Sequence, residues 1–184
     1  LRLAPDFRVD ELKTEQPPVH ALESAVLIIL YPHEGQLCTV VILRNEYDGA
    51  HSGQISLPGG KREKSDVDFK QTALREANEE IGIIPADMQI LGQLSRFYVR
   101  PSNYIIYPFI AFHPGQPVFH PDATEVQRII EIDIFKDLTY SSIVSKTLTF
   151  KSNFQITAPG FVVQKEFMWG ATAMIFSELM QILN

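Results

Sequence analysis

Cysteine is nearly absent from this sequence, and long hydrophobic runs are missing altogether. Cys38 is the single cysteine among 184 residues, which excludes an internal disulfide framework and a zinc site built from several cysteines. The longest uninterrupted apolar stretch covers residues 25–31, far short of the roughly 20 residues that a membrane-spanning helix needs. We therefore expect a soluble protein of a reducing compartment, the cytoplasm, in which Cys38 is buried and unreactive.

An excess of positive charge is also lacking. The chain has 16 Lys and Arg against 22 Asp and Glu, a formal net charge of −6, so a surface that coats nucleic acid is not expected. The hydrophobic fraction of 45% and the charged fraction of 21% exclude global disorder and are ample for one buried core. A phosphate-bearing substrate is compatible with this composition if a metal ion or a local cation neutralises it.

Short apolar runs and two amphipathic segments predict an α+β fold. Residues 25–31 and 38–43 are rich in Val, Leu and Ile and predict two buried strands joined as a hairpin near Gly35. Further strands are expected within residues 88–99, 104–112, 125–134 and 148–156. Pro108 favours an edge or bulged position for its strand. Residues 170–183 predict an amphipathic closing helix.

The whole chain, residues 1–184, is expected to form a single domain. Residues 1–20 are mixed polar and contain Pro17-Pro18, and they predict an extended or partly helical lead-in. A loop is expected from residue 45 to about residue 60. It ends in Pro-Gly-Gly at residues 58–60, which should turn the backbone because this tripeptide continues neither a helix nor a central strand.

The strongest chemical signal lies on a helix predicted from about residue 68 to residue 81. Gly82 stands where a glycine ends a helix. Glu76, Glu79 and Glu80 occupy one face of this helix, within an arc of roughly 100°. These like charges repel one another, and they lie near the helix C-terminus, where the helix dipole disfavours anions.

A positive partner would offset both penalties. Carboxylate oxygens suit Mg²⁺ or Mn²⁺ better than zinc, and Arg75 can orient one carboxylate through an i, i+4 pair with Glu79. A solvated acidic helix face is the simpler alternative. The glycine-rich loop upstream brings flexible backbone and amide donors beside the same helix, which supports the metal site, but such loops are frequent and both interpretations stay open on these residues alone.

This pattern resembles the signature of Nudix hydrolases. Gly59-Gly60, Asp66 and the run REANEEIG at residues 75–82 are similar to that family's loop–helix–loop, which here covers residues 59–83. The second half of the match is complete. In the first half, Gly60 lies one residue further from Arg75 than in the common pattern, and Asp66 stands where glutamate is usual.

A longer stretch is similar to the coenzyme A pyrophosphatase branch of the same family, with which we associate the extra loop residue. The spacing of that branch's upstream motif is kept at Arg44, His51, Gly53 and residues 58–60. Three positions depart from it, where the branch usually has Ser or Ala, Arg and Phe: Asn45, Gly49 and Leu57. The missing arginine at position 49 would remove a phosphate contact.

The resemblance implies a Nudix-type α/β/α sandwich with a mixed central sheet, and an enzyme that cleaves a nucleoside diphosphate linked to another group. It implies Glu76, Glu79 and Glu80 as ligands of Mg²⁺ or Mn²⁺, one carboxylate also acting as general base. Glu125 is the candidate for a further glutamate from a downstream loop, and a plain surface acid is the alternative. Asp66 either holds an outer metal or caps the helix.

The resemblance also implies a substrate, coenzyme A or its thioesters, cleaved to 3′,5′-ADP and (acyl-)4′-phosphopantetheine. The implied substrate contacts are Arg44, His51, Gly59 and Gly60. Lys61 and Arg62 are further cations near the motif that could meet the 3′-phosphate, and a solvated loop charge is the alternative for both.

Two alternatives stay open. The same chemistry could act on ADP-ribose, NADH or a dinucleoside polyphosphate. A non-catalytic Nudix-fold module that senses a nucleotide is the alternative of a different class, although such modules generally lose a helix glutamate. A homodimer is common in the family, and the sequence identifies no interface.

Overall fold

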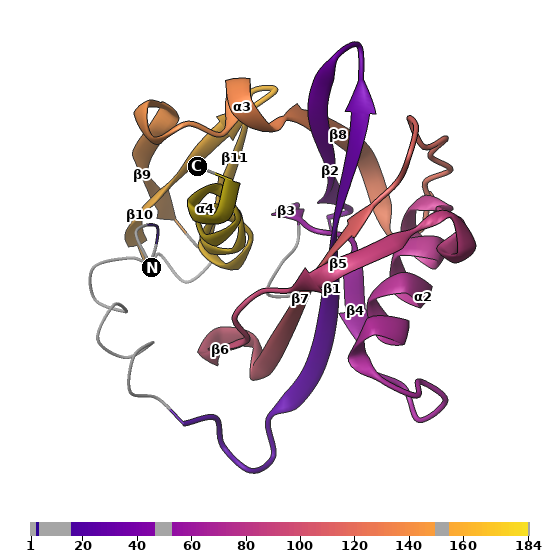
Figure 1. Ribbon diagram of the computed structural model, residues 1–184. Helices are drawn as coiled ribbons and strands as arrows, with labels where there is room; N and C mark the ends of the chain where they lie inside the picture. Colours follow the sequence, from indigo (N-terminus) through magenta and orange to yellow (C-terminus); the bar gives the residue numbers. More distant parts are fainter. Residues whose placement is uncertain (1–2, 4–15, 47–52, 150–154, 184) are drawn as a thin grey trace.

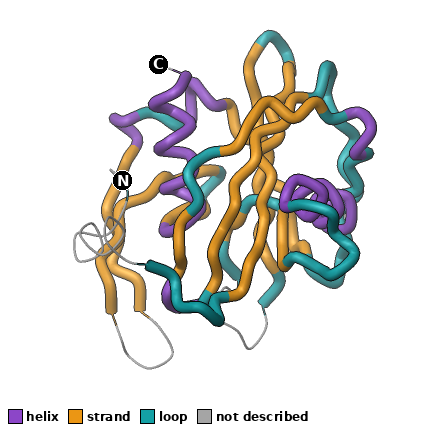
Figure 2. Tube along the Cα trace, turned by 60° about the horizontal axis from the view of Figure 1, so that its bottom comes forward, coloured by secondary structure: helices purple, strands orange, loops and turns teal. Residues whose placement is uncertain are grey.

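The computed structural model describes residues 3, 16–46, 53–149 and 155–183, and its elements form three layers (Figure 1). Helix α2 (Phe69–Ile81) covers one face of a mixed sheet, and helix α4 (Gly170–Leu183) lies on the other side. Figure 2 shows the two helices on opposite sides of the strands. The expected α/β/α arrangement is confirmed. Within the described residues, no helix combines the length and apolar character needed to cross a membrane.

The main sheet combines parallel and antiparallel strands. Its centre is β1 (Leu22–His33), which runs parallel to β7 (Tyr104–Phe112). On its other edge, β1 pairs antiparallel with β4 (Gly59–Lys61) near its beginning and with β2 (Gln36–Arg44) at its end. The remaining strands pair with β2 or β7: β3 (Ile55–Ser56) and β8 (Val126–Asp133) with β2, and β5 (Gln89–Gln93) and β6 (Phe97–Val99) with β7.

A second, antiparallel sheet of three strands lies on the α4 side. It follows a short helix α3 (Ile134–Asp137) and consists of β9 (Ile143–Thr149), β10 (Gln155–Val163) and β11 (Glu166–Trp169). The single strand expected over residues 148–156 is wrong. Leu148 and Ile156 are cross-strand partners in β9 and β10, so the apolar residues belong to two facing strands. Short 3₁₀ turns occupy Pro85–Asp87, Arg100–Ser102 and Tyr140–Ser142.

Side-chain alternation along β1 divides the core into two parts. Ile28 and Leu30 belong to the cluster that contains α4, whereas Leu27 and Ile29 belong to the cluster beneath α2, because successive strand residues point to opposite faces. All four are buried. Strand β1 is therefore covered on both faces, as the apolar run at residues 25–31 predicts.

The ends of α2 follow from its capping residues. The Asp68 side chain accepts a hydrogen bond from the Gln71 amide at 2.7 Å, and Gly82 ends the helix in the left-handed region with φ 71°. The predicted helix and its C-terminal glycine are confirmed. Asp68, and not Asp66, caps the N-terminus, so the capping alternative for Asp66 is wrong.

Pro108 lies inside the sheet, because β7 has partners on both sides. The expected edge position is wrong, whereas the pairing of β7 with β5 does contain an irregularity, a register shift between Ile90 and Gly92. The Pro108 carbonyl accepts a hydrogen bond from Leu94 N at 2.9 Å. In a strand, the backbone N and O of one residue point to the same side. The N of Pro108, which carries no hydrogen, therefore faces the gap between β5 and β6, where the sheet needs no hydrogen-bond donor from this residue.

The expected hairpin between β1 and β2 is confirmed, with Gly35 at φ 79°.

Candidate active site

Strand β4 carries two glycines between β1 and α2. The backbone bends at Pro58, as expected, but the turn does not extend over residues 59 and 60, because Gly59 and Gly60 pair with Val26 and Ala25 in a short strand. The pairing needs a residue without a side chain. At Gly59, where φ is 149°, a Cβ atom would lie 2.3 Å from the Ala25 carbonyl oxygen.

The same two glycines serve the carboxylates of α2 in different ways. A Cβ atom on Gly60 would lie 2.3 Å from Glu76 Oε2, so the glycine leaves room for that carboxylate above the strand. The Gly59 N–H donates to Glu80 Oε2 at 2.8 Å. One glycine supplies space and the other supplies a hydrogen-bond donor.

Glu80 is a carboxylate inside the protein, with a side chain only 2% exposed. Arg44 Nη1 donates to its Oε1 at 3.1 Å, and Gly59 holds the other oxygen. Burial raises the pKa of Glu80 to about 7 despite these two donors, and the neighbouring carboxylates of Glu125 and Glu76 act in the same direction. A cation placed beside Glu80 would favour its ionised form.

Arg75 gathers a second group of carboxylates. Its Nη1 lies 3.0 Å from both Glu76 Oε1 and Glu79 Oε2, which confirms the expected i, i+4 pair. Its Nε and Nη2 donate to the two oxygens of Asp66 at 3.0 and 3.1 Å. Its Nη2 also donates to the Lys61 carbonyl at 3.0 Å, which ties α2 to β4.

Asp66 is fully occupied by protein donors. Besides Arg75, it accepts hydrogen bonds from the Thr72 hydroxyl and the Glu63 amide, both at 2.9 Å. The hydrogen bonds from Arg75 are the main reason that the pKa of Asp66 is lowered to about 2. With both oxygens engaged, Asp66 is positioned to orient Arg75 rather than to contact a ligand.

The three helix glutamates predicted as metal ligands differ in environment. Glu80 is buried, Glu76 is 16% exposed and Glu79 is 57% exposed. In the described part of the chain, no three His, Cys, Asp or Glu side chains are gathered tightly enough to hold a metal ion. The reason is geometric, since Arg75 draws Glu76 and Glu79 to one side while Arg44 and Gly59 hold Glu80 on the other.

The donor chemistry nevertheless fits a divalent cation. Arg44 is shared between Glu80 and Glu125, and Arg75 is shared among Asp66, Glu76 and Glu79. Carboxylates therefore outnumber guanidinium groups, and burial raises the pKa of Glu76 as well. Hard oxygen ligands with excess negative charge are what Mg²⁺ and Mn²⁺ prefer.

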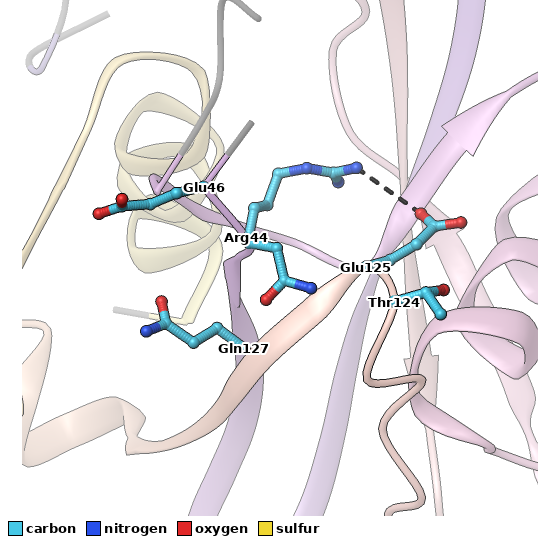
Figure 3. Close-up of a pocket in the computed structure, with 6 residues that line it drawn as sticks. Arg44, Glu46, Thr124, Glu125 and Gln127 are labelled. Carbon is cyan, nitrogen blue, oxygen red and sulfur yellow. Dashed lines mark ion pairs between the residues drawn. The ribbon is translucent and has the colours of Figure 1, made fainter. Parts of the chain in front are cut away.

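Glu125 comes to the site from the loop before β8. Its Oε2 lies 3.8 Å from Arg44 Nη2 (Figure 3). The loop is fixed at both ends, because Asp122 N donates to the Glu80 carbonyl at 2.9 Å and Asn45 N donates to the Glu125 carbonyl at 3.1 Å. The structure thus brings Glu125 and Glu80 to the same guanidinium group.

An open hollow of about 610 Å³ adjoins the Arg44–Glu125 pair (Figure 3). The residues that line it are Arg44, Asn45, Glu46, Thr124, Glu125 and Gln127. His51, an expected substrate contact, and Gly49 lie outside the described residues. Lys61 is exposed at the end of β4, and the Arg62 guanidinium lies 4.6 Å from the centre of the Phe69 ring.

Two positioning residues were missed by the sequence analysis. Asn45 was noted only as a departure from a motif, yet its Nδ2 donates to the Ala123 carbonyl at 2.9 Å and anchors the Glu125 loop. Asp122 Oδ1 accepts hydrogen bonds from Thr124 N and Oγ1, both at 2.8 Å. An Asp followed two residues later by Thr is typical of an Asx turn, so that signal was available in the sequence.

Comparison with solved structures identifies the fold. A MutT/nudix family protein from Enterococcus faecalis gives a TM-score of 0.58 at 16% identity, over 93% of this chain and 66% of that one. A Nudix hydrolase from M. smegmatis, RenU, gives 0.54 at 17% identity, over 63% and 73%. The Nudix domain of Shewanella oneidensis NrtR, solved with ADP ribose, gives 0.51 at 15% identity, over 72% and 85%. The fold is a Nudix fold.

Sequence comparison then assigns the family. The family model described as the NUDIX domain matches residues 21–136. The uncharacterized Nudix hydrolase NudL of Pectobacterium atrosepticum is 30% identical over 164 residues, which cover 88% of this chain and 83% of the relative. The chain belongs to the Nudix hydrolase family. It is a pyrophosphohydrolase for nucleoside diphosphate derivatives, and enzymes of this family generally use divalent metal ions.

Proposed function

We propose that the protein hydrolyses the diphosphate bond of coenzyme A or its thioesters, giving 3′,5′-ADP and (acyl-)4′-phosphopantetheine. One observation carries the choice of substrate. The residues that resemble the coenzyme A branch are also those that touch the buried carboxylate: Arg44 and Gly59 hold the two oxygens of Glu80. The residues of the motif therefore lie in the candidate active site itself.

The proposed metal ligands are Glu76, Glu79 and Glu80, with Mg²⁺ or Mn²⁺ as the ion. A bound divalent ion would neutralise diphosphate oxygens and lower the pKa of a water molecule. The described arrangement supports this role through the space above Gly60, the excess of carboxylates and the partial burial of Glu76. Glu79, which is exposed and paired with Arg75, would join the other two ligands by turning away from Arg75.

The remaining residues position these carboxylates. Asp66 orients Arg75, and Arg75 holds Glu76 and Glu79 at 3.0 Å. Arg44 links Glu80 to Glu125, so that a carboxylate from the downstream loop faces the helix. A fixed set of charges of this kind stabilises the developing charge of phosphoryl transfer without reorganisation.

A second substrate class is supported by two observations. The arginine that the coenzyme A branch usually has at position 49 is replaced by glycine. The Nudix domain of NrtR, which shares the fold, was solved with ADP ribose. ADP-ribose, NADH and dinucleoside polyphosphates therefore belong in the same experiment.

The test is a substrate panel. The purified protein is incubated with Mg²⁺ or Mn²⁺ and coenzyme A, acetyl-coenzyme A, NADH, ADP-ribose and diadenosine polyphosphates, and the products are identified by mass. Preferential release of 3′,5′-ADP from the coenzyme A compounds is the expected result. Preferential cleavage of another compound keeps the Nudix chemistry and rejects the substrate. Binding without turnover would favour a nucleotide sensor.

A further inference from the structure

Coenzyme A differs from most ADP-containing compounds in its 3′-phosphate, a doubly charged group that needs a cationic partner. Arg75 is engaged by Asp66, Glu76 and Glu79, and the predicted cationic contacts that remain to be compared are Arg44, Lys61 and Arg62. We propose that Arg62 binds this phosphate and so selects 3′-phosphorylated substrates. The inference rests on the proposed function, whose own failure the experiment below distinguishes.

Arg44 and Lys61 are unsuited to binding this phosphate. Arg44 is already committed to Glu80 at 3.1 Å and to Glu125 at 3.8 Å. Lys61 follows Gly60 along β4, so its side chain points to the opposite face of the strand from Gly60. The Glu76 carboxylate lies over the Gly60 face.

Arg62 returns to the Gly60 face. The Arg62 N–H donates to the Glu23 carbonyl at 3.0 Å and so continues the pairing of β4 with β1. Gly60 lies beneath the Glu76 carboxylate, and Arg62 is two residues further along the strand, a distance of about 6.6 Å. The Arg62 side chain therefore starts about 6.6 Å along the strand from the point beneath that carboxylate. In a bound nucleotide, the distance from the diphosphate to a phosphate on the ribose is similar to this two-residue distance along the strand.

The guanidinium of Arg62 is held in place before any ligand binds. It lies 4.6 Å from the centre of the Phe69 ring, and that ring stacks on Tyr107 with centroids 3.7 Å apart and planes 8° from parallel. Its Nη2 contacts the carbonyl oxygens of Asp66 and Val67 at 3.4 Å. Its Nε and Nη1 have no hydrogen-bond partner among the described residues, so they are available to an anion. A preorganised guanidinium binds phosphate with little further loss of entropy.

The same stack contains a matched control. Arg96 lies 5.8 Å from the centre of the Tyr107 ring, and its Nη1 donates to the Tyr107 hydroxyl at 3.1 Å. Tyr107 belongs to β7, on the side of β1 away from β4. The Tyr107 hydroxyl also donates to the Glu23 carboxylate at 3.2 Å. Arg96 therefore shares the aromatic stack with Arg62 but not its place beside β4.

The first experiment compares coenzyme A with 3′-dephospho-coenzyme A, which differ only in that phosphate. Arg62→Gln should lower kcat/KM for coenzyme A by about tenfold to a hundredfold and change the value for the dephosphorylated compound by less than about twofold. Arg96→Gln should leave the ratio of the two unchanged. Equal losses on both substrates in Arg62→Gln, or a wild-type enzyme that does not discriminate between them, would overturn the inference.

A binding measurement separates this inference from the proposed function. By calorimetry, the wild-type protein should bind 3′,5′-ADP about tenfold more tightly than 5′-AMP, and Arg62→Gln should abolish the difference. If coenzyme A is not cleaved but this difference is found, the phosphate site stands and the proposed reaction fails. If coenzyme A is cleaved but the two nucleotides bind equally, the reaction stands and the role of Arg62 is rejected. Thermal unfolding of each variant confirms that the fold is retained.

Discussion

Two buried carboxylates near α2 are each paired with an arginine, yet their proton affinities are shifted in opposite directions. Asp66 accepts hydrogen bonds from Arg75, Thr72 and the Glu63 amide, and its pKa is lowered to about 2. Glu80 accepts hydrogen bonds from Arg44 and the Gly59 amide, and its pKa is raised to about 7.

The difference lies in how completely the protein itself satisfies each charge. Around Asp66, two bonds from one guanidinium, a hydroxyl and an amide outweigh the cost of burial. Around Glu80, two donors do not outweigh burial, and the carboxylates of Glu76 and Glu125 add repulsion. Asp66 is complete as it stands and has a structural role. Glu80 lacks positive charge, which is the condition expected of a ligand for a divalent cation.

The largest effect should come from removing the charge of Glu80. We expect Glu80→Gln to lower kcat/KM by about a thousandfold, because the amide keeps the shape of the side chain but cannot ligate or neutralise a cation in the same way. Activity is measured on the preferred substrate of the panel, and the fold is checked by circular dichroism.

Glu63→Gln is the matched control for this change. It removes the same charge from an exposed residue of the loop before α2, and activity should stay within about twofold of the wild type. Turnover at the wild-type level in Glu80→Gln would show that the site is assigned to the wrong residues.

The second effect is on stability, and it tests directly whether the pKa values of Asp66 and Glu80 are shifted in opposite directions. Asp66→Asn should lower the free energy of unfolding at pH 7 by about 2 kcal/mol. Because the pKa of Asp66 in the folded protein lies below its ordinary value of 3.8, its contribution is present above about pH 4 and is lost as the pH falls towards 2. Chemical denaturation between pH 3 and 8 measures it.

In the same series without divalent metal, Glu80→Gln should behave in the opposite way. The folded protein holds the proton of Glu80 up to about pH 7, whereas the ordinary value is 4.5, so wild-type stability relative to this variant falls as the pH rises from about 4.5 to about 7. Adding Mg²⁺ should restore the stability that the wild-type protein loses over this pH range. Parallel pH profiles for the two variants would contradict the comparison.

Local signals were sufficient to predict α2, and they were insufficient for β4. The helix is specified within its own sequence by Asp68, by Gly82 and by the apolar positions that face the sheet. The strand depends on β1, because Gly59 adopts its conformation against the Ala25 carbonyl, more than thirty positions earlier in the chain.

The roles of the acidic residues show the same limit. REANEEIG at residues 75–82 predicted which helix face carries the chemistry, because helical spacing fixes that face. It did not predict that Glu80 would be buried and Glu79 exposed, since burial is decided by β4 and the Glu125 loop. Nor did it predict that Asp66 would be hydrogen-bonded to Arg75, which lies nine residues further along the chain.

The smallest effect concerns Glu125, which shares Arg44 with Glu80. Its side chain is 55% exposed, and its Oε2 lies 3.8 Å from Arg44 Nη2. Water competes for such a contact, so Glu125→Gln should lower kcat/KM by about tenfold or less. Most of the loss should appear as a higher metal concentration for half-maximal rate. Glu46→Gln, in the same hollow, is the control and should change neither value. A loss as large as that of Glu80→Gln would mean that the loop carboxylate, and not the buried one, is the principal charge of the site.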